Sequence, residues 1–159
     1  RQRQMCIRDR LIEEIDKTEG SKPIAVIFNL GVNDLGNAGN YVSYMTNIAS
    51  TLKSKNCKLF YMSVNPINST MITKAGRGAR TEAQVREFNS KIRSGLSLDY
   101  KYIDMYSVLM KKGYGTNASY NGTDADSDDG LHYTTKTFKR IYYYCITYLN
   151  TGSINASYY

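Results

Sequence analysis

The sequence predicts an α/β domain in which helices cover a parallel β-sheet. Short, almost wholly apolar runs alternate with helix-like segments along the 159 residues. Apolar runs without a polar face are typical of strands buried on both sides of a parallel sheet. Their alternation with helices is typical of doubly wound layers. The composition, 42% hydrophobic and 22% charged, fits one globular domain with a substantial core.

The first half of the chain predicts two helices and two strands. An apolar pattern indicates a helix that stops near Gly20, and residues 24–30 form the first strand-like run. Residues 41–53 carry apolar side chains at helical spacing, which predicts the second helix. Residues 58–64 form the second strand-like run, which ends at Asn65-Pro66.

The second half begins with an expected loop over residues 67–80, which holds three basic residues. Thr81 can cap a helix whose apolar positions include Phe88. Residues 100–103 predict a third strand, and residues 104–110 predict one or two helical turns.

A polar loop is expected over residues 111–131, and a loop of this length usually serves a site. The final helix should start near Thr134. We expect Tyr142 on its buried stripe and Tyr143 and Tyr144 at the edges of that stripe, toward solvent. The full predicted stripe is Phe138, Ile141, Tyr142, Cys145, Ile146 and Leu149.

Three regions are expected: a tail over residues 1–10, one domain over residues 11–150 and a frayed tail over residues 151–159. The first ten residues, RQRQMCIRDR, resemble the peptide encoded by sequencing-adapter DNA at the broken end of a gene, and we expect them to be non-native. The alternative is a basic surface tail. Their four arginines and one aspartate account for +3 of the net charge of +7.

Charge, hydropathy and cysteine spacing argue against several partners. The lysines are scattered rather than clustered with aromatic residues, which disfavours nucleic-acid binding. No run approaches the ~18 apolar residues of a membrane span. Cys6, Cys57 and Cys145 lack the spacing of a disulfide framework or a metal site. We therefore expect no metal, no cofactor, no nucleic acid and no membrane span, and the oligomeric state stays open.

Three polar segments follow predicted strands and should meet at one edge of the sheet. Right-handed crossovers place the carboxyl ends of parallel strands, and the sites that form there, along the same edge. The segments are Gly31–Asp34, Asn65 and Asp129–His132. The candidate chemistry of the chain should therefore lie together.

His132 is the single histidine of the chain, and Asp129 precedes it by three residues. A neutral imidazole is suited to general-base catalysis near pH 7, and a carboxylate can hold its tautomer. Gly130 gives the backbone the freedom to turn so that the two side chains meet. Asp126 and Asp128 could compete for the orienting role. Alternatively, His132 is only a residue before a helix, among surface aspartates.

Asn33 lies in the sequence Gly31-Val32-Asn33-Asp34, directly after a predicted strand. Its amide could donate a hydrogen bond to negative charge that develops on an acyl oxygen. Gly31 allows the sharp turn, and Asp34 is expected to brace the loop by accepting backbone N–H bonds. The alternative is a plain strand-to-helix turn.

Together the two motifs resemble the last two of the four signature blocks of the SGNH (GDSL-type) hydrolase family of esterases and lipases. The resemblance covers residues 11–149 in order and context. It implies a flavodoxin-like three-layer α/β/α sandwich and a Ser-His-Asp esterase mechanism without a metal. It assigns Asp129 and His132 as catalytic acid and base and Asn33 to the oxyanion hole, with Gly31, Asp34 and Asn65 as substrate-binding neighbours.

The chain departs from that family in two ways. No Gly-Asp-Ser block, which would carry the nucleophilic serine, occurs in it, and the block that supplies a second oxyanion-hole N–H has no counterpart. Both would lie on strands before residue 11. Ser63 and Ser69 are the nearest serines, and neither has the setting of a nucleophile. We expect the chain as given to be inactive and its sheet edge to favour aggregation.

The substrate class that these features favour is a small-molecule, lipid or carbohydrate ester. A loop rich in Asn and Tyr favours an O-acetylated or otherwise acylated carbohydrate. The polar surface favours action outside a bacterial cell or at its surface.

The main alternative is a non-catalytic carbohydrate-binding module on the same fold. It would use Tyr and Asn side chains to stack on sugars and to bond them; the candidates are Tyr114, Asn117, Tyr120, Asn121 and Tyr133. A solvated loop with its tyrosines packed against the sheet explains the same residues more simply. A receiver or flavin-binding domain is disfavoured, because the acidic pair and the phosphate-binding loop are not evident.

Overall fold

The computed structural model describes residues 2–18, 20, 22–114 and 129–154, with side chains from residue 8 onward. Its sheet has three parallel strands in the order β1 (Ile24–Phe28), β2 (Cys57–Met62) and β3 (Tyr100–Ile103). Strand β1 pairs with β2 from Ile24 opposite Cys57 onward, and β2 pairs with β3 from Leu59 opposite Tyr100 onward. The predicted α/β class with a parallel sheet is confirmed.

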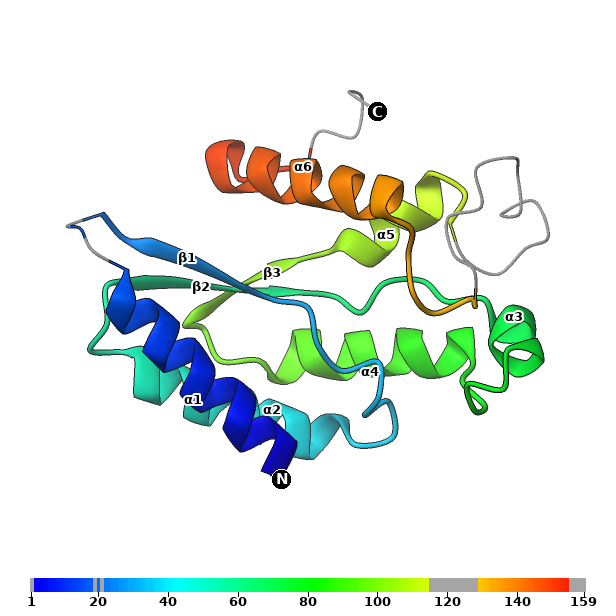
Figure 1. Cartoon of the computed structure of the whole chain (residues 1–159), viewed down its shortest axis with the longest axis horizontal. Helices are drawn as coiled ribbons and strands as arrows, with labels where there is room; N and C mark the ends of the chain where they lie inside the picture. Colours follow the sequence, from blue (N-terminus) through cyan, green and yellow to red (C-terminus); the bar gives the residue numbers. More distant parts are fainter. Residues whose placement is uncertain (1, 19, 21, 115–128, 155–159) are drawn as a thin grey trace.

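Helices cover both faces of the sheet (Figure 1). Helices α1 (Gln2–Lys17), α2 (Ala38–Leu52) and α4 (Glu82–Gly95) lie on one face. Helices α5 (Met105–Lys111) and α6 (Thr135–Thr151) lie on the other face, and the short α3 (Ser69–Lys74) lies beyond the carboxyl ends of the strands. The chain therefore forms the three layers of an α/β/α sandwich.

Strand β2 is buried on both sides, as its apolar run predicts. Leu59 and Tyr61 belong to the core under α1, α2 and α4, whereas Phe60 and Met62 belong to the core under α5 and α6. This alternation follows from the two-residue period of a strand. The side chains of the central strand therefore pack against the helices on both faces of the sheet.

Aromatic side chains form much of the core under α2 and α4. The ring of Tyr41 makes edge contacts with Tyr61 and Phe88. The hydroxyl of Tyr61 donates to the carbonyl of Leu30 at 2.7 Å, and the hydroxyl of Tyr100 donates to the carbonyl of Met45 at 2.7 Å. The hydroxyl groups of these buried tyrosines are therefore hydrogen-bonded, although their rings lie in an apolar core.

The expected loop over residues 67–80 contains helix α3, so that prediction is corrected. Asn68 caps the helix: its side-chain oxygen accepts a hydrogen bond from the backbone N–H of Met71 at 3.0 Å. A helix of six residues is too short to show an apolar period. The predicted cap at Thr81 is confirmed, because Thr81 and Gln84 form a reciprocal capping box.

Helix α1 runs through most of the predicted tail. Residues 2–10 continue without a break into the helical segment that ends at Lys17. That residues 1–10 are non-native stays a prediction.

The predicted stripe of α6 is only partly right. Ile141 and Cys145 are buried as expected, but Tyr142 is 61% exposed and Tyr144 is 2% exposed. Phe138 and Ile146 are exposed as well. The buried side of α6 therefore holds Ile141, Tyr144 and Cys145, whereas the predicted stripe included Tyr142 in place of Tyr144. Among the described helices, none is both long and apolar enough to cross a membrane.

Candidate active site

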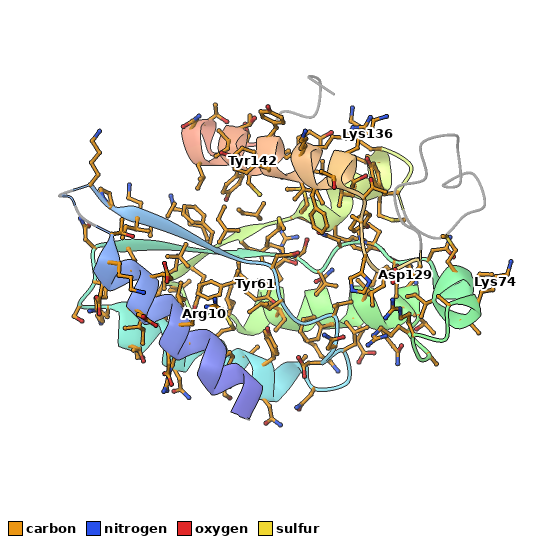
Figure 2. The ribbon with its side chains drawn as sticks, viewed as in Figure 1. Arg10, Tyr61, Lys74, Asp129, Lys136 and Tyr142 are labelled. Atoms are coloured by element: carbon orange, nitrogen blue, oxygen red, sulfur yellow. The ribbon has the colours of Figure 1, made fainter. Side chains whose placement is uncertain are left out.

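The acid and base candidates form a closed turn just before α6. Figure 2 shows Asp129 beside α3, on the side of the molecule away from the start of β1. Oδ1 of Asp129 accepts hydrogen bonds from the backbone N–H groups of Leu131 and His132, at 2.9 and 2.8 Å. Oδ2 of Asp129 lies 2.6 Å from Nδ1 of His132. A carboxylate only accepts, so Nδ1 carries the proton and Nε2 is left as the basic nitrogen of the neutral ring. The predicted meeting of the two side chains is confirmed.

Gly130 makes this turn possible. Its φ of +77° lies in the left-handed region, and an added Cβ would stand 2.5 Å from the carbonyl oxygen of Asn68. The backbone N–H of Asn68 donates to the carbonyl of Gly130 at 2.9 Å. The turn is therefore docked tightly against the start of α3.

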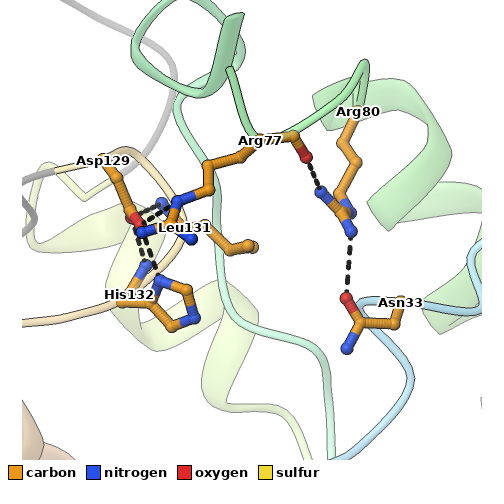
Figure 3. A network of polar contacts seen from close by, with 6 residues as sticks. All are labelled: Asn33, Arg77, Arg80, Asp129, Leu131 and His132. Carbon is orange, nitrogen blue, oxygen red and sulfur yellow. Dashed lines mark hydrogen bonds and ion pairs between the residues drawn. The ribbon is translucent and has the colours of Figure 1, made fainter. Parts of the chain in front are cut away.

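The carboxyl of Asp129 is held in its ionised form. Burial acts to raise its pKa, but hydrogen bonds from the backbone and ring of His132 and from the backbone of Leu131 outweigh burial. The pKa of Asp129 consequently lies well below its usual range. Nε of Arg77 adds an ion pair, 3.2 Å from Oδ2 (Figure 3).

Asn33 is presented by a tight turn after β1. Gly31 has a φ of +116°, and an added Cβ would stand 2.5 Å from the ring of Phe88. The backbone N–H of Asp34 donates to the carbonyl of Gly31 at 2.8 Å. The expected side-chain brace is wrong: among the described residues, nothing donates a hydrogen bond to the carboxylate of Asp34, and backbone bonds close the turn instead.

Two arginines that the sequence did not single out connect the motifs (Figure 3). Arg80 donates from Nη2 to Oδ1 of Asn33 at 2.9 Å and from Nε to the carbonyl of Val32 at 3.1 Å. Its Nη1 donates to the carbonyl of Arg77 at 2.6 Å, and Arg77 reaches Asp129. The only sequence signal for this bridge was the basic character of the segment between α3 and α4.

His132 and Asn65 share an apolar cavity of about 190 Å³. Asn65 is 9% exposed, and its buried Oδ1 has no hydrogen-bond partner among the described residues. Asn33 instead lines a neighbouring cavity, and Val32 lines both. Gly31 and Asp34 line neither. The apolar cavity is bounded by Asn29, Leu30, Val32, Val64, Asn65, Ile67, Leu131, His132, Tyr133 and Phe138.

The two nearest serines have structural positions. Ser63 is fully buried, and its hydroxyl oxygen accepts the backbone N–H of Tyr106 at 2.8 Å. Ser69 is the first residue of α3. That neither serine is the nucleophile stays a prediction.

The candidate sugar-stacking residues differ in how accessible they are. Tyr114 is buried, and its hydroxyl accepts a hydrogen bond from Arg140 at 2.8 Å, so its ring is not available to a sugar. Tyr133 lines the apolar cavity and donates its hydroxyl to the carbonyl of Pro66. Asn117, Tyr120, Asn121, Asp126 and Asp128 lie outside the described residues.

Among the described residues, no three histidine, cysteine, aspartate or glutamate side chains gather in a way that could hold a metal ion. Cys145 is buried, and burial raises the pKa of its thiol to about 11, whereas Cys57 is half-buried. Neither thiol is activated.

Comparisons of the chain with protein-family models, with curated proteins and with solved structures found no match. The arrangement of the site alone therefore carries the functional argument.

Proposed function

We propose that the chain is the C-terminal part of an SGNH-type serine esterase that cleaves small-molecule, lipid or carbohydrate esters. The observation that carries the proposal is the 2.6 Å contact between Oδ2 of Asp129 and Nδ1 of His132, beside a cavity that His132 lines. An ionised carboxylate on Nδ1 leaves Nε2 as a base, which is the arrangement that acyl transfer by a serine requires.

In the proposed reaction, Nε2 of His132 takes the hydroxyl proton of the serine as its oxygen attacks the ester carbonyl. Asp129 stabilises the imidazolium that forms. The amide Nδ2–H of Asn33 donates to the oxyanion, an interaction of about 3–4 kcal/mol in the transition state. His132 then returns the proton to the leaving alcohol. His132 then takes a proton from water as the water attacks the acyl-serine, the carboxylic acid leaves, and His132 returns the proton to the serine oxygen.

The serine belongs to none of the described residues in this scheme. Among the described strands, β1 pairs only with β2, and none of them pairs with its other edge. We propose that a strand carrying Gly-Asp-Ser adds at this edge, next to Gly31. The 159-residue chain by itself should then lack esterase activity.

The test has two stages. Long-read sequencing upstream of the codon for Leu11 should reveal an in-frame strand that ends in Gly-Asp-Ser. The extended protein should react with a fluorophosphonate at that serine and hydrolyse p-nitrophenyl acetate. Asp129→Asn should lower kcat by about 10⁴-fold, and His132→Ala should abolish the His-dependent rate. Asp99→Asn is the matched control, because Asp99 is exposed and its side chain is hydrogen-bonded, among the described residues, only to Ser97.

Three results would count against the proposal. One is an upstream sequence without such a strand, and the second is hydrolysis that His132→Ala leaves unchanged. The third is rapid, His132-dependent hydrolysis by the 159-residue chain itself. Carbohydrate binding that survives Asn33→Ala and His132→Ala would point to the binding module instead.

A further inference from the structure

A polar cavity of about 260 Å³ lies beside the apolar one. Val32 lines both cavities, so they adjoin at this residue. Asn33, Arg77 and Arg80 line the polar cavity, and none of the acidic side chains that the structure describes does. If an ester carbonyl is held at Asn33, one side of the ester would lie in the apolar cavity near His132 and the other side in the basic cavity.

The positive charge of Arg80 has no carboxylate partner among the described residues. Its three hydrogen bonds go to neutral oxygens, those of Val32, Arg77 and the Asn33 amide. A guanidinium carries five N–H donors, so two remain after these bonds. A half-buried cation that is hydrogen-bonded only to neutral oxygens still attracts an anion.

Arg77 adds a second set of donors to the same cavity. Its Nε contacts Asp129, and its two terminal nitrogens have no partner among the described residues. The side chain is 56% exposed and runs from the segment that carries Arg80 toward Asp129 (Figure 3). Two arginines with unused N–H donors thus line the same cavity.

Holding the loop in place does not explain these features. A neutral donor could make the bonds of Arg80 to Asn33 and Val32, and Arg77 reaches Asp129 through only one of its nitrogens. Guanidinium groups are suited to planar or tetrahedral oxyanions because several parallel N–H donors can meet several oxygens.

We propose that the cavity lined by Asn33, Arg77 and Arg80 binds an anionic group, a carboxylate or a phosphate, on the substrate of this site. The inference rests on the proposed function, because it places the anion on the part of the ester that lies away from the apolar cavity. The substrate class becomes an acylated small molecule with an acidic group, such as an acylated acidic sugar.

The test is a titration of the ¹⁵N-labelled 159-residue chain, followed by NMR. The probes are glucuronate, glucose 6-phosphate and neutral glucose. One or both anions should shift the amide signals of Gly78 and the Nε signals of the two arginines, with at least about tenfold tighter binding than glucose. The affinity should fall as salt is raised. The stronger of the two anions identifies the group as carboxylate or phosphate.

Variants then assign the binding to the two arginines. Arg77→Gln and Arg80→Gln should each weaken anion binding by about tenfold, whereas Arg80→Lys should retain part of it. Lys74→Gln removes the same charge from the neighbouring helix α3, outside the cavity lining, and should leave binding nearly unchanged. Circular dichroism and thermal melting show that each variant is folded.

The proposal is overturned if neither anion binds better than glucose, or if Lys74→Gln weakens binding as much as the arginine variants do. Its failure can be told apart from failure of the esterase proposal. An extended protein that hydrolyses p-nitrophenyl acetate while the chain ignores both anions overturns only the anion site. Salt-sensitive anion binding without any hydrolysis leaves the anion site in place and removes the esterase.

Discussion

Nη2 of Arg80 donates a hydrogen bond to Oδ1 of Asn33 at 2.9 Å. Because a guanidinium is only a donor, this contact fixes which end of the amide faces the arginine. The amide nitrogen of Asn33 points away from Arg80 (Figure 3). The side chain of Asn33 is thereby held with its amide N–H groups turned away from Arg80, free of that hydrogen bond.

Replacing Arg80 by alanine should release that amide. We expect the Nδ2–H₂ pair of Asn33, assigned by its loss in Asn33→Ala, to move toward the shifts of a free side chain in ¹⁵N NMR spectra. Arg93→Ala, at an exposed position on α4, should not move it. Unchanged Asn33 signals in Arg80→Ala would mean that the turn alone orients the amide.

Gly130→Ala should destabilise the fold more than a left-handed backbone alone requires. Gly130 and Gly152 have nearly the same φ, +77° and +75°, but a Cβ meets backbone only at Gly130. The left-handed penalty is about 1–2 kcal/mol at each, and the close contact with Asn68 should add at least about 1 kcal/mol at Gly130. Urea unfolding measures both variants. Equal losses would show that the turn can move away from α3.

Asp129 should contribute stability that acid removes. Its folded pKa lies below the unfolded value of about 3.9, so the unfolded chain binds more protons in between. The contribution is present above about pH 4 and declines as pH falls below that value. The difference in free energy of unfolding between wild type and Asp129→Asn should therefore be larger at pH 5 than at pH 3. The same pair of measurements on Asp99→Asn, which removes an exposed carboxylate, is the control.

Two tyrosines on α6 provide a matched test of its orientation. Tyr144 is 2% exposed and Tyr142 is 61% exposed. Tyr144→Ala should lower the free energy of unfolding by about 3–5 kcal/mol, as loss of a large buried ring does. Tyr142→Ala should change it by no more than about 0.5 kcal/mol. Comparable losses in the two variants would mean that α6 is rotated from the orientation described.

The sheet could be predicted from sequence because its strands are nearly wholly apolar. A strand that is buried on both faces is apolar at almost every position, whatever packs against it. This accounts for the apolar runs of Ile24–Phe28 and Cys57–Met62. Helix α6 was harder. Its apolar residues occupy much of its circumference, and three tyrosines occur in a row, so only the packing against β2 and β3 decides which one is buried.

In the candidate site, too, some contacts could be predicted from the sequence and others could not. The contact between Asp129 and His132 could be predicted because it spans three residues and a single turn. The contact between Arg80 and Asn33 spans 47 residues and joins two irregular segments. No periodicity links such positions, so the basic bridge emerged only from the three-dimensional structure. The catalytic roles of Asp129, His132 and Asn33 stay predictions.

The tyrosine-rich layer under α2 and α4 should make this protein sensitive to alkali. Burial raises the pKa of Tyr41, Tyr61 and Tyr100 above the ordinary value of a phenol. Above about pH 10 the unfolded chain loses protons that the folded chain retains, so stability falls as pH rises. The hydroxyl of Tyr61 donates a hydrogen bond to the carbonyl of Leu30, the residue before Gly31. Ionisation of Tyr61 removes this donor, and with it the hydrogen bond that holds the segment after β1. Strong base should thus loosen the turn of Asn33 as the aromatic layer comes apart.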